Sequence, residues 1–241
     1  MTIEAQSLFG LGLYSISDVA RYIGSEPQKV KRWVAGHTYP YRDHRHTSQP
    51  VIQTTLEQTD EENVLTFLDL IELRFVAEFR KHEVSLQTIR VCARRAAERY
   101  DTQHPFATRR FATDGRTIFT ILEGEGDKPD GISMRRYTED LLTQGGVFEE
   151  FVRRFFVAQI EPDEEEWFAR RWYPLGKEKR VVLDPARAFG KPIDSETGVP
   201  TSVLYDSTKS DETVDDIAAW YEVPVDAVVQ AIEYEKSLLI A

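Results

Sequence analysis

The sequence predicts a mainly α protein with small β elements, divided into two modules. Near the N-terminus, two short helices separated by a glycine form a helix-turn-helix pattern, and a turn-rich segment after them is typical of a winged hairpin. Near the C-terminus, short strands precede a second pair of helices with a helix-turn-helix-like pattern. We therefore expect a winged head with a helical extension over residues 1–116, a connecting region over 117–175, and a small α+β module over 176–241.

The composition is that of a globular chain with a substantial core. Its 241 residues are 41% hydrophobic, and no apolar run approaches the roughly 20 residues that a membrane span needs. The N-terminus also lacks the pattern of a secretory signal, so we expect a cytoplasmic protein with no membrane role. Cys92 is the single cysteine, which excludes an internal disulfide, and its Ala-rich surroundings predict a small core residue.

Charge is distributed unevenly along the chain. The net charge is -11, yet residues 1–120 carry 16 basic against 15 acidic side chains, whereas residues 121–241 carry 14 against 26. Within the first half, residues 21–45 hold six basic and two acidic side chains. Because binding to phosphates needs Lys and Arg, this basic patch on the helix-turn-helix pattern predicts binding to double-stranded DNA there.

Local signals place the two helices of the N-terminal pattern. Ser17 is the expected N-cap of a helix over 18–23, and Gly24 ends it. Ala20 is small enough to let the two helices cross closely. The second helix is expected to begin at a capping box made by Ser25, Pro27 and Gln28.

The second helix has an apolar face and a polar face. Val30, Trp33 and Val34 repeat at core spacing. The residues left outside are suited to base edges and phosphates, and with two arginines of the wing they form the predicted DNA-binding set: Gln28, Lys29, Lys31, Arg32, Arg42 and Arg45. The wing segment, 36–51, also contains three histidines, but it lacks cysteine and the ordered spacing of a zinc site, so we expect neither a metal nor a cofactor.

This region resembles the head of MerR-type regulators. The matching stretches are GLYSISDVARYIGSEPQKVKRWVAG, LTFLDLIELRFVAEFR and HEVSLQTIRVCARRAAERY. In the first of the later helices, an apolar stripe is predicted at Leu65, Leu68, Ile71, Phe75 and Phe79. In the second, Ser85 is the expected cap, and the outward arginines are interpreted either as a solvated face or as phosphate contacts: Arg90, Arg94, Arg95 and Arg99.

The middle of the chain contains no pattern of an active site. Residues 108–121 alternate around Asp114-Gly115, which predicts a hairpin, and a helix from Val147 carries an aromatic stripe that is more typical of a core than of a cofactor pocket. No glycine-rich phosphate loop follows a strand. The acidic run at 164–166 is typical of a solvated face, so we do not expect an enzyme.

The C-terminal module begins with a strand from Val181 and ends in the second helical pair. Thr213 is expected to cap the first helix, with Val214, Ile217, Ala218 and Tyr221 inward. Pro224 opens the second, with Val225, Val228, Val229 and Ile232 at core spacing. Its predicted outward residues are Asp226, Gln230, Glu233 and Glu235, which would repel phosphate. We expect this pair, with Trp220 and Tyr221, to pack against its own copy or against another protein.

The module is similar to the unknown-function family 433, which often forms the C-terminal part of bacterial antitoxins. The residues that match are Asp184-Pro185, Phe189-Gly190-Lys191-Pro192, Gly198-Val199-Pro200-Thr201 and the spacing from Val214 to Ala231. Together with the MerR-like head, this pairing resembles VapB-type antitoxins. The resemblance implies a protein that neutralises a PIN-domain ribonuclease toxin and binds operator DNA to autoregulate transcription.

The resemblance also suggests a toxin-binding surface. Aromatic side chains would serve as anchors and an arginine would meet the metal-binding carboxylates of the toxin; the candidates are Arg170, Arg171, Trp172, Tyr173 and Phe189. We expect a homodimer or a higher even oligomer, since one recognition helix buries little surface. The alternative is a stand-alone MerR-like regulator whose aromatic middle region binds a small effector.

Overall fold

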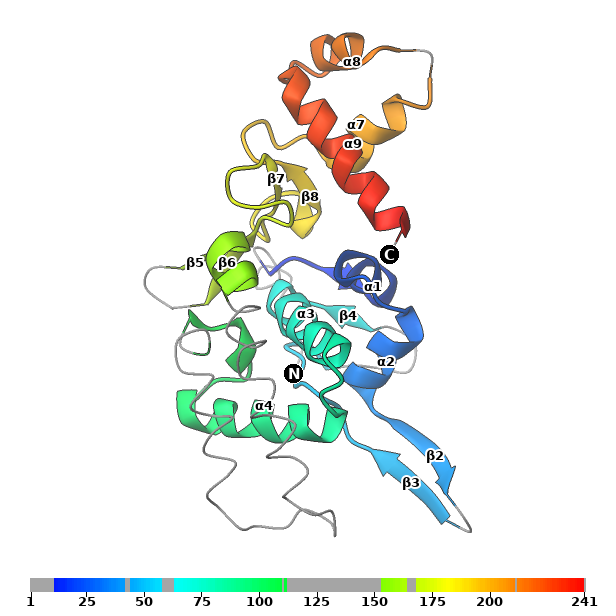
Figure 1. Cartoon of the computed structure of the whole chain (residues 1–241), viewed down its shortest axis with the longest axis vertical. Coiled ribbons are helices and arrows are strands. Elements are labelled where there is room, and N and C mark those ends of the chain that lie inside the picture. The colour runs from blue at the N-terminus through cyan, green and yellow to red at the C-terminus, as the bar shows by residue number, and fades with distance from the viewer. Residues whose placement is uncertain are drawn as a thin grey trace.

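A computed structural model describes residues 11–41, 44–57, 63–109, 111, 153–163, 168–210 and 212–240. The fold is mainly α with small β elements, which confirms the predicted class. Figure 1 shows the head at one end of an elongated molecule, a small sheet in the middle and three helices at the other end. Most of the predicted hairpin at 108–121 and the start of the helix predicted from Val147 lie outside the described residues.

The described residues of the head form four α-helices and two small antiparallel β pairs. Its helices are α1 (Ile16–Ile23), α2 (Pro27–Ala35), α3 (Phe67–Lys81) and α4 (Leu86–Tyr100), and its strands are β1 (Tyr14–Ser15), β2 (His37–Tyr41), β3 (His44–Ser48) and β4 (Val64–Leu65). Strand β1 pairs with β4, and β2 pairs with β3. The β2–β3 pair is the wing that the turn-rich segment predicts, with His37 opposite Ser48.

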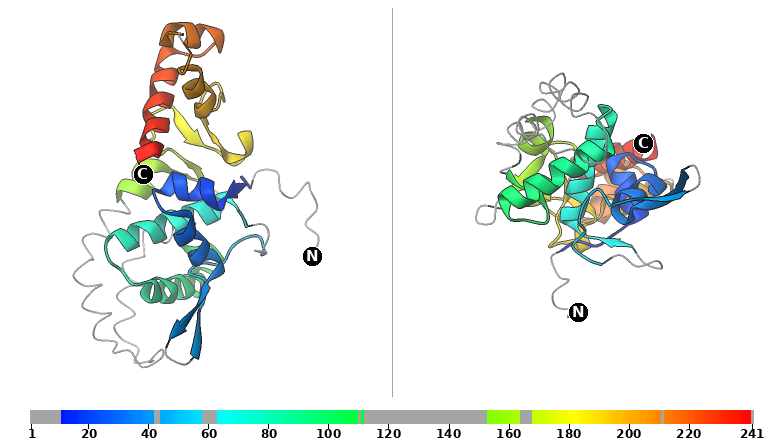
Figure 2. Two further views of the ribbon diagram at one scale, coloured as in Figure 1. Left: turned by 90° about the vertical axis from the view of Figure 1, so that its right-hand side faces the viewer. Right: turned by 90° about the horizontal axis from the view of Figure 1, so that it is seen from below.

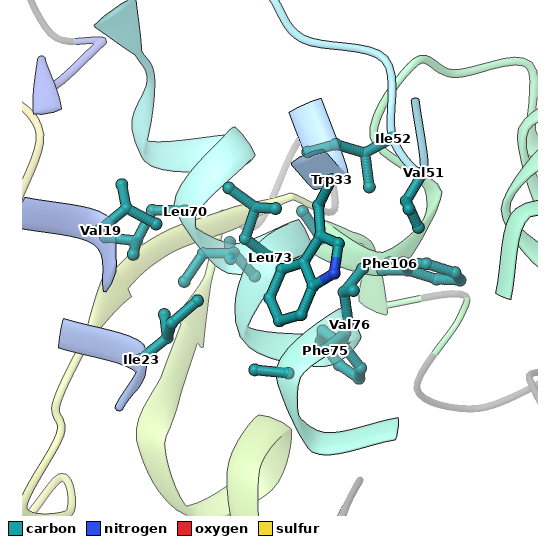
Figure 3. Close-up of a cluster of buried hydrophobic side chains, with 14 of the residues drawn as sticks. Val19, Ile23, Trp33, Val51, Ile52, Leu70, Leu73, Phe75, Val76 and Phe106 are labelled. Atoms are coloured by element: carbon teal, nitrogen blue, oxygen red, sulfur yellow. The ribbon is translucent and has the colours of Figure 1, made fainter. Parts of the chain in front are cut away.

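Helix α3 is the centre of the head and is buried on almost every side. Figure 3 shows Leu73 and Phe75 of α3 among side chains of α1 and α2, including Trp33. A helix that is apolar all round is typical of a core position. The predicted stripe was partly wrong, because Leu65 lies in β4 rather than in the helix and Leu68 is only half-buried.

Two predicted helix starts are corrected by the structure. Helix α1 begins at Ile16, and its cap is Ser15, whose Oγ accepts from the backbone N–H of Asp18 at 3.1 Å. Ser15 has an acidic residue three positions later, which completes a capping box that Ser17 cannot form. Glu26 rather than Ser25 precedes α2, because Pro27 occupies the first helical position and the Ser25 N–H bonds to the carbonyl of Ala20.

The described part of the connecting region packs into the core of the head. A π-helical turn, η3 (Arg153–Val157), carries Phe155 and Phe156, which are 2% and 4% exposed and contact the ring of Phe75. These two aromatic side chains therefore fill the core. The four-stranded antiparallel sheet follows with strand order β5-β6-β7-β8; its strands are β5 (Ile160–Pro162), β6 (Ala169–Trp172), β7 (Val181–Leu183) and β8 (Pro192–Asp194).

The chain ends in three helices with a second core of their own. They are α7 (Thr201–Ser207), α8 (Val214–Trp220) and α9 (Val225–Ile240). The predicted cap of α8 is confirmed, since the Thr213 Oγ1 accepts from the backbone N–H of Asp216 at 3.2 Å. The core contains Leu204, Ile217, Ala218, Val223, Ala227, Val228 and Ala231.

The predicted orientation of α9 was partly wrong. Val225 and Val229 are 44% and 47% exposed, although their spacing fits a core position. Gln230 and Glu235, predicted to face solvent, are buried instead. Gln230 accepts from the Arg180 N–H at 2.7 Å, and Glu235 accepts from the Thr201 hydroxyl at 2.5 Å, so both polar groups find partners inside the module.

The head encloses a fully buried carboxyl group at Glu72. Glu72 of α3 accepts from the backbone N–H of Ala107 at 3.1 Å, in the short 3-10 turn η2 (Pro105–Ala107), and from that of Phe106. Its other oxygen, Oε2, is buried without a hydrogen-bond partner among the described residues. Burial raises the pKa of Glu72 well above its ordinary value, although the two backbone donors oppose this effect.

Two further expectations concern Cys92 and membranes. Cys92 is fully buried in the core, as predicted, and burial raises the pKa of its thiol. Among the described residues, no helix combines the length and the apolar character needed to cross a membrane.

Candidate nucleic-acid interface

Helices α1 and α2 form the predicted helix-turn-helix. Gly24 ends α1 in the left-handed conformation, with φ 65°, and lets the chain turn at once into α2. Val19 and Ala20 of α1 and Val30 of α2 are at most 1% exposed. This tight packing fixes the orientation of α2 and therefore the direction in which its outer side chains point.

The outer face of α2 presents the four predicted DNA-binding side chains to solvent. Gln28, Lys29, Lys31 and Arg32 are all exposed. Lys29 forms an exposed ion pair with Glu26 at 2.6 Å, which is worth little in water and is easily exchanged for a phosphate. Within the described part of the chain, Lys31 and Arg32 form no ion pair, so their charges are available to a ligand.

The wing lies beside α2. Gly36 directs the chain into β2 with φ 70°, and a Cβ at this position would collide with the carbonyl oxygen of Ser48. Of the two wing residues predicted to bind DNA, Arg45 lies in β3 and Arg42 lies outside the described residues. The candidate interface therefore combines one helix with one β hairpin, as seen in Figure 1.

Arg90 of α4 supports the wing rather than facing solvent alone. Its Nε donates to the Gln49 carbonyl at 2.8 Å, and its Nη2 donates to the Ser48 Oγ at 2.7 Å. The sequence alone is compatible with a solvated Arg90 and with one that contacts phosphate. The structure shows that it holds the end of β3 against α4, whereas Arg94 and Arg99 are exposed.

A basic hollow of about 490 Å³ lies between the helix-turn-helix and the end of α3. Four cationic side chains line it: Lys29, Arg32, Arg80 and Lys81. Arg80 donates to the Val84 carbonyl at 2.6 Å, and Lys81 lies 3.5 Å from the Glu78 carboxylate. Sequence reasoning missed Arg80 and Lys81, because nothing local shows that the last turn of α3 lies next to α2. The hollow extends the basic surface beyond the recognition helix.

The head is joined to the C-terminal module by hydrogen bonds around a strained turn. Ala188 and Phe189 have φ values of 47° and 55°, in the left-handed region that non-glycine residues rarely adopt. The Phe189 carbonyl accepts from Leu13 N–H at 3.1 Å, and the Gly190 carbonyl accepts from the Tyr14 hydroxyl at 2.8 Å. These bonds hold the turn, which leaves the Phe189 ring 68% exposed.

The predicted toxin-binding residues separate into exposed and internal groups. Arg170 and Phe189 are exposed. Arg171 instead pairs with Asp184 at 2.8 Å, and Trp172 is only 3% exposed with its indole N–H near Gln159. The Tyr173 hydroxyl donates to Glu161 at 3.1 Å. Trp172 is too deeply buried to anchor a partner, which corrects the prediction at this residue. Arg171 and Tyr173 are half-buried, and Arg170 and Phe189 are the exposed candidates.

No group of three or more His, Cys, Asp or Glu side chains in the described ranges is placed to hold a metal ion. A regulatory DNA interface needs none, because its chemistry consists of charge, hydrogen bonding and shape.

Comparison with protein families identifies both modules. Residues 12–93 match the family model described as "Putative DNA-binding HTH domain". Residues 181–234 match the model described as "Protein of unknown function (DUF433)". The chain therefore contains a helix-turn-helix DNA-binding domain and a DUF433 domain. The candidate interface on α2 and the wing lies entirely within the first of these matches.

Two proteins of Mycobacterium tuberculosis (strain ATCC 25618 / H37Rv) are similar along nearly the whole chain. "Putative antitoxin VapB45" is 25% identical over 236 residues, covering 95% of this chain and 96% of the relative. "Uncharacterized protein Rv2308" is 23% identical over 244 residues, covering 99% and 96%. The crystal structure of Rv2018 from Mycobacterium tuberculosis has a TM-score of 0.69 at 24% identity, covering 93% of this chain and 99% of that chain. At this identity the likeness shows a shared fold.

Proposed function

We propose that this chain is the antitoxin of a type II toxin-antitoxin system, which binds operator DNA through a MerR-like head and neutralises a PIN-domain ribonuclease toxin through its C-terminal half. The observation that carries the DNA-binding part is the exposed cationic face of α2 within the matched helix-turn-helix domain, where Lys31 and Arg32 form no ion pair with a described residue. Full-length similarity to a protein named as an antitoxin supports the second part. The protein acts by binding and is not an enzyme.

DNA binding uses α2 in the major groove, with the wing and the basic hollow on the phosphates. Gln28 can hydrogen-bond base edges, and Lys31 and Arg32 can neutralise phosphates. Arg80 and Lys81 extend the contact to the backbone next to the recognition helix. A homodimer or higher even oligomer would bring two such heads to paired half-sites and supply the surface that one short helix lacks.

Salt-dependent DNA binding tests this part. In the double variant Lys31→Ala/Arg32→Ala, two phosphate contacts are removed, so the slope of log K against log salt should flatten by about 1.8. Operator affinity in a gel-shift titration should fall as well. The control Lys191→Ala/Lys209→Ala removes two exposed lysines from the C-terminal module, with the same change in net charge. Equal effects in both variants would exclude α2 as the reading element.

Toxin binding uses the exposed turn at Phe189. Ala188 and Phe189 have left-handed backbone conformations, and strain of this kind costs about 1–3 kcal/mol per residue and clusters at functional sites. The strain here leaves a large aromatic side chain in solvent, which is typical of an anchor in a protein interface. Arg170 is the exposed arginine that can meet the toxin's metal-binding carboxylates, and the acidic half of the chain is attracted to a basic nuclease.

Glycine substitutions at Phe189 and Ala188 separate the role of the Phe189 ring in toxin binding from its effect on stability. Phe189→Gly removes the ring and also relieves the left-handed strain, so toxin binding should weaken while the free energy of unfolding stays equal or rises. Ala188→Gly is the matched control, because it relieves the same strain and leaves the ring in place. Both are co-expressed as full chains with the product of the adjacent gene and scored for growth rescue and co-elution on gel filtration. Equal rescue by both variants would remove Phe189 from the interface.

A stand-alone regulator that responds to a small effector is the second candidate. Two described aromatic residues of its middle region, Phe155 and Phe156, are buried in the core, so neither of them lines an effector pocket. Failure of the wild-type chain to rescue growth or to co-elute, while it still represses its own promoter, would favour this second candidate.

A further inference from the structure

Helix α9 has two apolar faces; among the described residues, one of them lies inside the protein and the other is largely exposed. The inner face carries Ala227, Val228 and Ala231, which lie in the core of the C-terminal module. The outer face carries Val225, Val229 and Leu239, which are 44%, 47% and 71% exposed. Figure 2 shows α9 along the outer edge of the module, with α7 and the sheet on its other side.

The outer face has the spacing of a helix-pairing seam. Val225, Val229, Ile232, Lys236 and Leu239 follow one another at intervals of four, three, four and three residues, and of these Ile232 is half-buried and also packs against the inner core. We call these five residues the α9 seam. This alternation is the a/d repeat of paired helices, and it spans roughly 21 Å at 1.5 Å per residue. Single exposed apolar residues are common on protein surfaces, but a straight stripe that runs along the helix indicates a binding surface.

The surroundings of the α9 seam are acidic. Residues 212–236 expose six acidic side chains and a single basic one, Lys236. Asp226 and Glu233 each follow a seam residue directly, so they lie along one flank of the stripe. Trp220, at the end of α8, is 79% exposed and precedes the turn into α9. The surface therefore consists of an apolar stripe, an exposed indole and carboxylates beside them.

Charge decides between the occupants of such a seam. A second copy of this chain would bring its own acidic flank close to that of the first copy, and like charges at the edge of an interface cost affinity. A partner helix with an apolar stripe and Lys or Arg on its flanks would meet opposite charges along the same length. Complementary flanking charges are what selects partners in paired helices.

We propose, on the basis of the partner-binding function proposed above, that the α9 seam binds an amphipathic helix of the toxin that carries basic flanking residues. This places a second contact on the C-terminal module, in addition to the turn at Phe189. Lys236 lies within the stripe, where its aliphatic stem covers apolar surface and its ammonium reaches solvent. The acidic flank provides the specificity and the apolar stripe provides most of the affinity.

Designed peptides test this proposal on the full chain without a known toxin. The probes are helical peptides of about three heptads with Leu at the a and d positions and either Lys or Glu at the flanking positions. Fluorescence anisotropy should show that the Lys-flanked peptide binds at least tenfold more tightly than the Glu-flanked one. A scrambled Lys peptide without the a/d spacing should bind as weakly as the Glu-flanked one, which excludes general charge attraction.

Reversing the acidic charges beside the α9 seam should exchange which of the two peptides binds more tightly. In Asp226→Lys/Glu233→Lys the Glu-flanked peptide should become the tighter ligand, whereas the control Glu98→Lys/Glu178→Lys, with equal charge change on exposed residues elsewhere, should keep the original preference. Val229→Asp should weaken both peptides at least tenfold, and circular dichroism checks that this half-exposed site still folds. Preferences that do not change with the α9 charges would overturn the proposal.

Two further measurements separate the occupants and the underlying function. Sedimentation that detects a dimer of the wild type but not of Val229→Asp would assign the α9 seam to a second copy and overturn the proposal. If the adjacent gene product binds the wild type and Asp226→Lys/Glu233→Lys equally well, toxin binding by this chain is supported. The proposal that the toxin binds at the α9 seam is then contradicted. The Lys-flanked peptide could bind as described while the adjacent gene product does not bind. That result would support the α9 seam as a helix-binding surface and would overturn the assignment of its partner to the toxin.

Discussion

The two helical pairs of this chain start from the same local design and present opposite surfaces. Helices α1 and α8 both begin at a capping box, formed by Ser15 with Asp18 and by Thr213 with Asp216. Each is followed after a short turn by a longer helix. Helix α2 presents an exposed face with Lys31 and Arg32, whereas α9 presents the α9 seam with carboxylates beside it. The comparison teaches that helix-turn-helix geometry alone does not make a DNA reader, and that exposed side chains decide the ligand.

A tryptophan in each pair gives the largest expected contrast. Trp33 of α2 is 5% exposed in the head core, whereas Trp220 of α8 is 79% exposed. Trp33→Ala should lower the free energy of unfolding by about 3–5 kcal/mol, because it leaves a cavity among packed side chains. Trp220→Ala should change it by less than about 0.5 kcal/mol. Urea denaturation measures both values. A large loss of stability in Trp220→Ala would mean that the end of α8 is covered within this chain.

The carboxyl groups of the two modules should respond to pH in opposite directions. Burial raises the pKa of Glu72 in the head, so its contribution to stability is full below about pH 4.3 and is lost as the pH rises through the folded pKa. In the C-terminal module, burial alone would raise the pKa of Asp194, but the Arg180 guanidinium and the Thr197 donors outweigh it and lower that pKa. Asp194 therefore stabilises the fold above about pH 3.9, and this contribution is lost in acid.

Two variants test these directions by thermal unfolding across pH. Glu72→Gln mimics the protonated acid and should flatten the decline in stability above about pH 4.3. Asp194→Asn breaks a 2.6 Å contact with Arg180, so it should cost about 2 kcal/mol at neutral pH and flatten the loss in acid. Parallel pH profiles for wild type and Glu72→Gln would contradict a raised pKa in the head.

The last prediction concerns the contact between the modules, where a single hydroxyl is removed. Tyr14→Phe removes the hydroxyl that donates to the Gly190 carbonyl and leaves that buried acceptor without this partner, so stability should fall by about 1 kcal/mol. Hydrogen exchange at the Leu13 N–H, which bonds to Phe189, should accelerate as the junction opens more often. The control Tyr221→Phe removes a hydroxyl contact with Ser207 within the C-terminal module and should leave Leu13 unchanged. Equal exchange at Leu13 in both variants would argue against a role of this bond in joining the modules.

The sequence by itself determined the features that depend on neighbours along the chain. Apolar spacing located α2 and its core residues Val30 and Trp33, and the same periodicity placed Lys31 and Arg32 outside. The Thr213 cap was equally local. Such features follow from helical geometry and from backbone groups within one turn, so a single stretch of sequence is sufficient to predict them.

Only the tertiary structure decided what depends on distant partners. Helix α9 has two apolar faces of similar spacing, and the partners of Gln230 and Glu235 on other elements select the inner one. The sequence alone allowed Trp172 to be a surface anchor, but in the structure the sheet and the head core enclose this side chain. The Tyr14 to Gly190 contact joins residues 176 positions apart. Burial is a property of the whole packed chain. The apolar pattern within one helix specifies which of its faces can be buried, but it does not specify which face contacts another element.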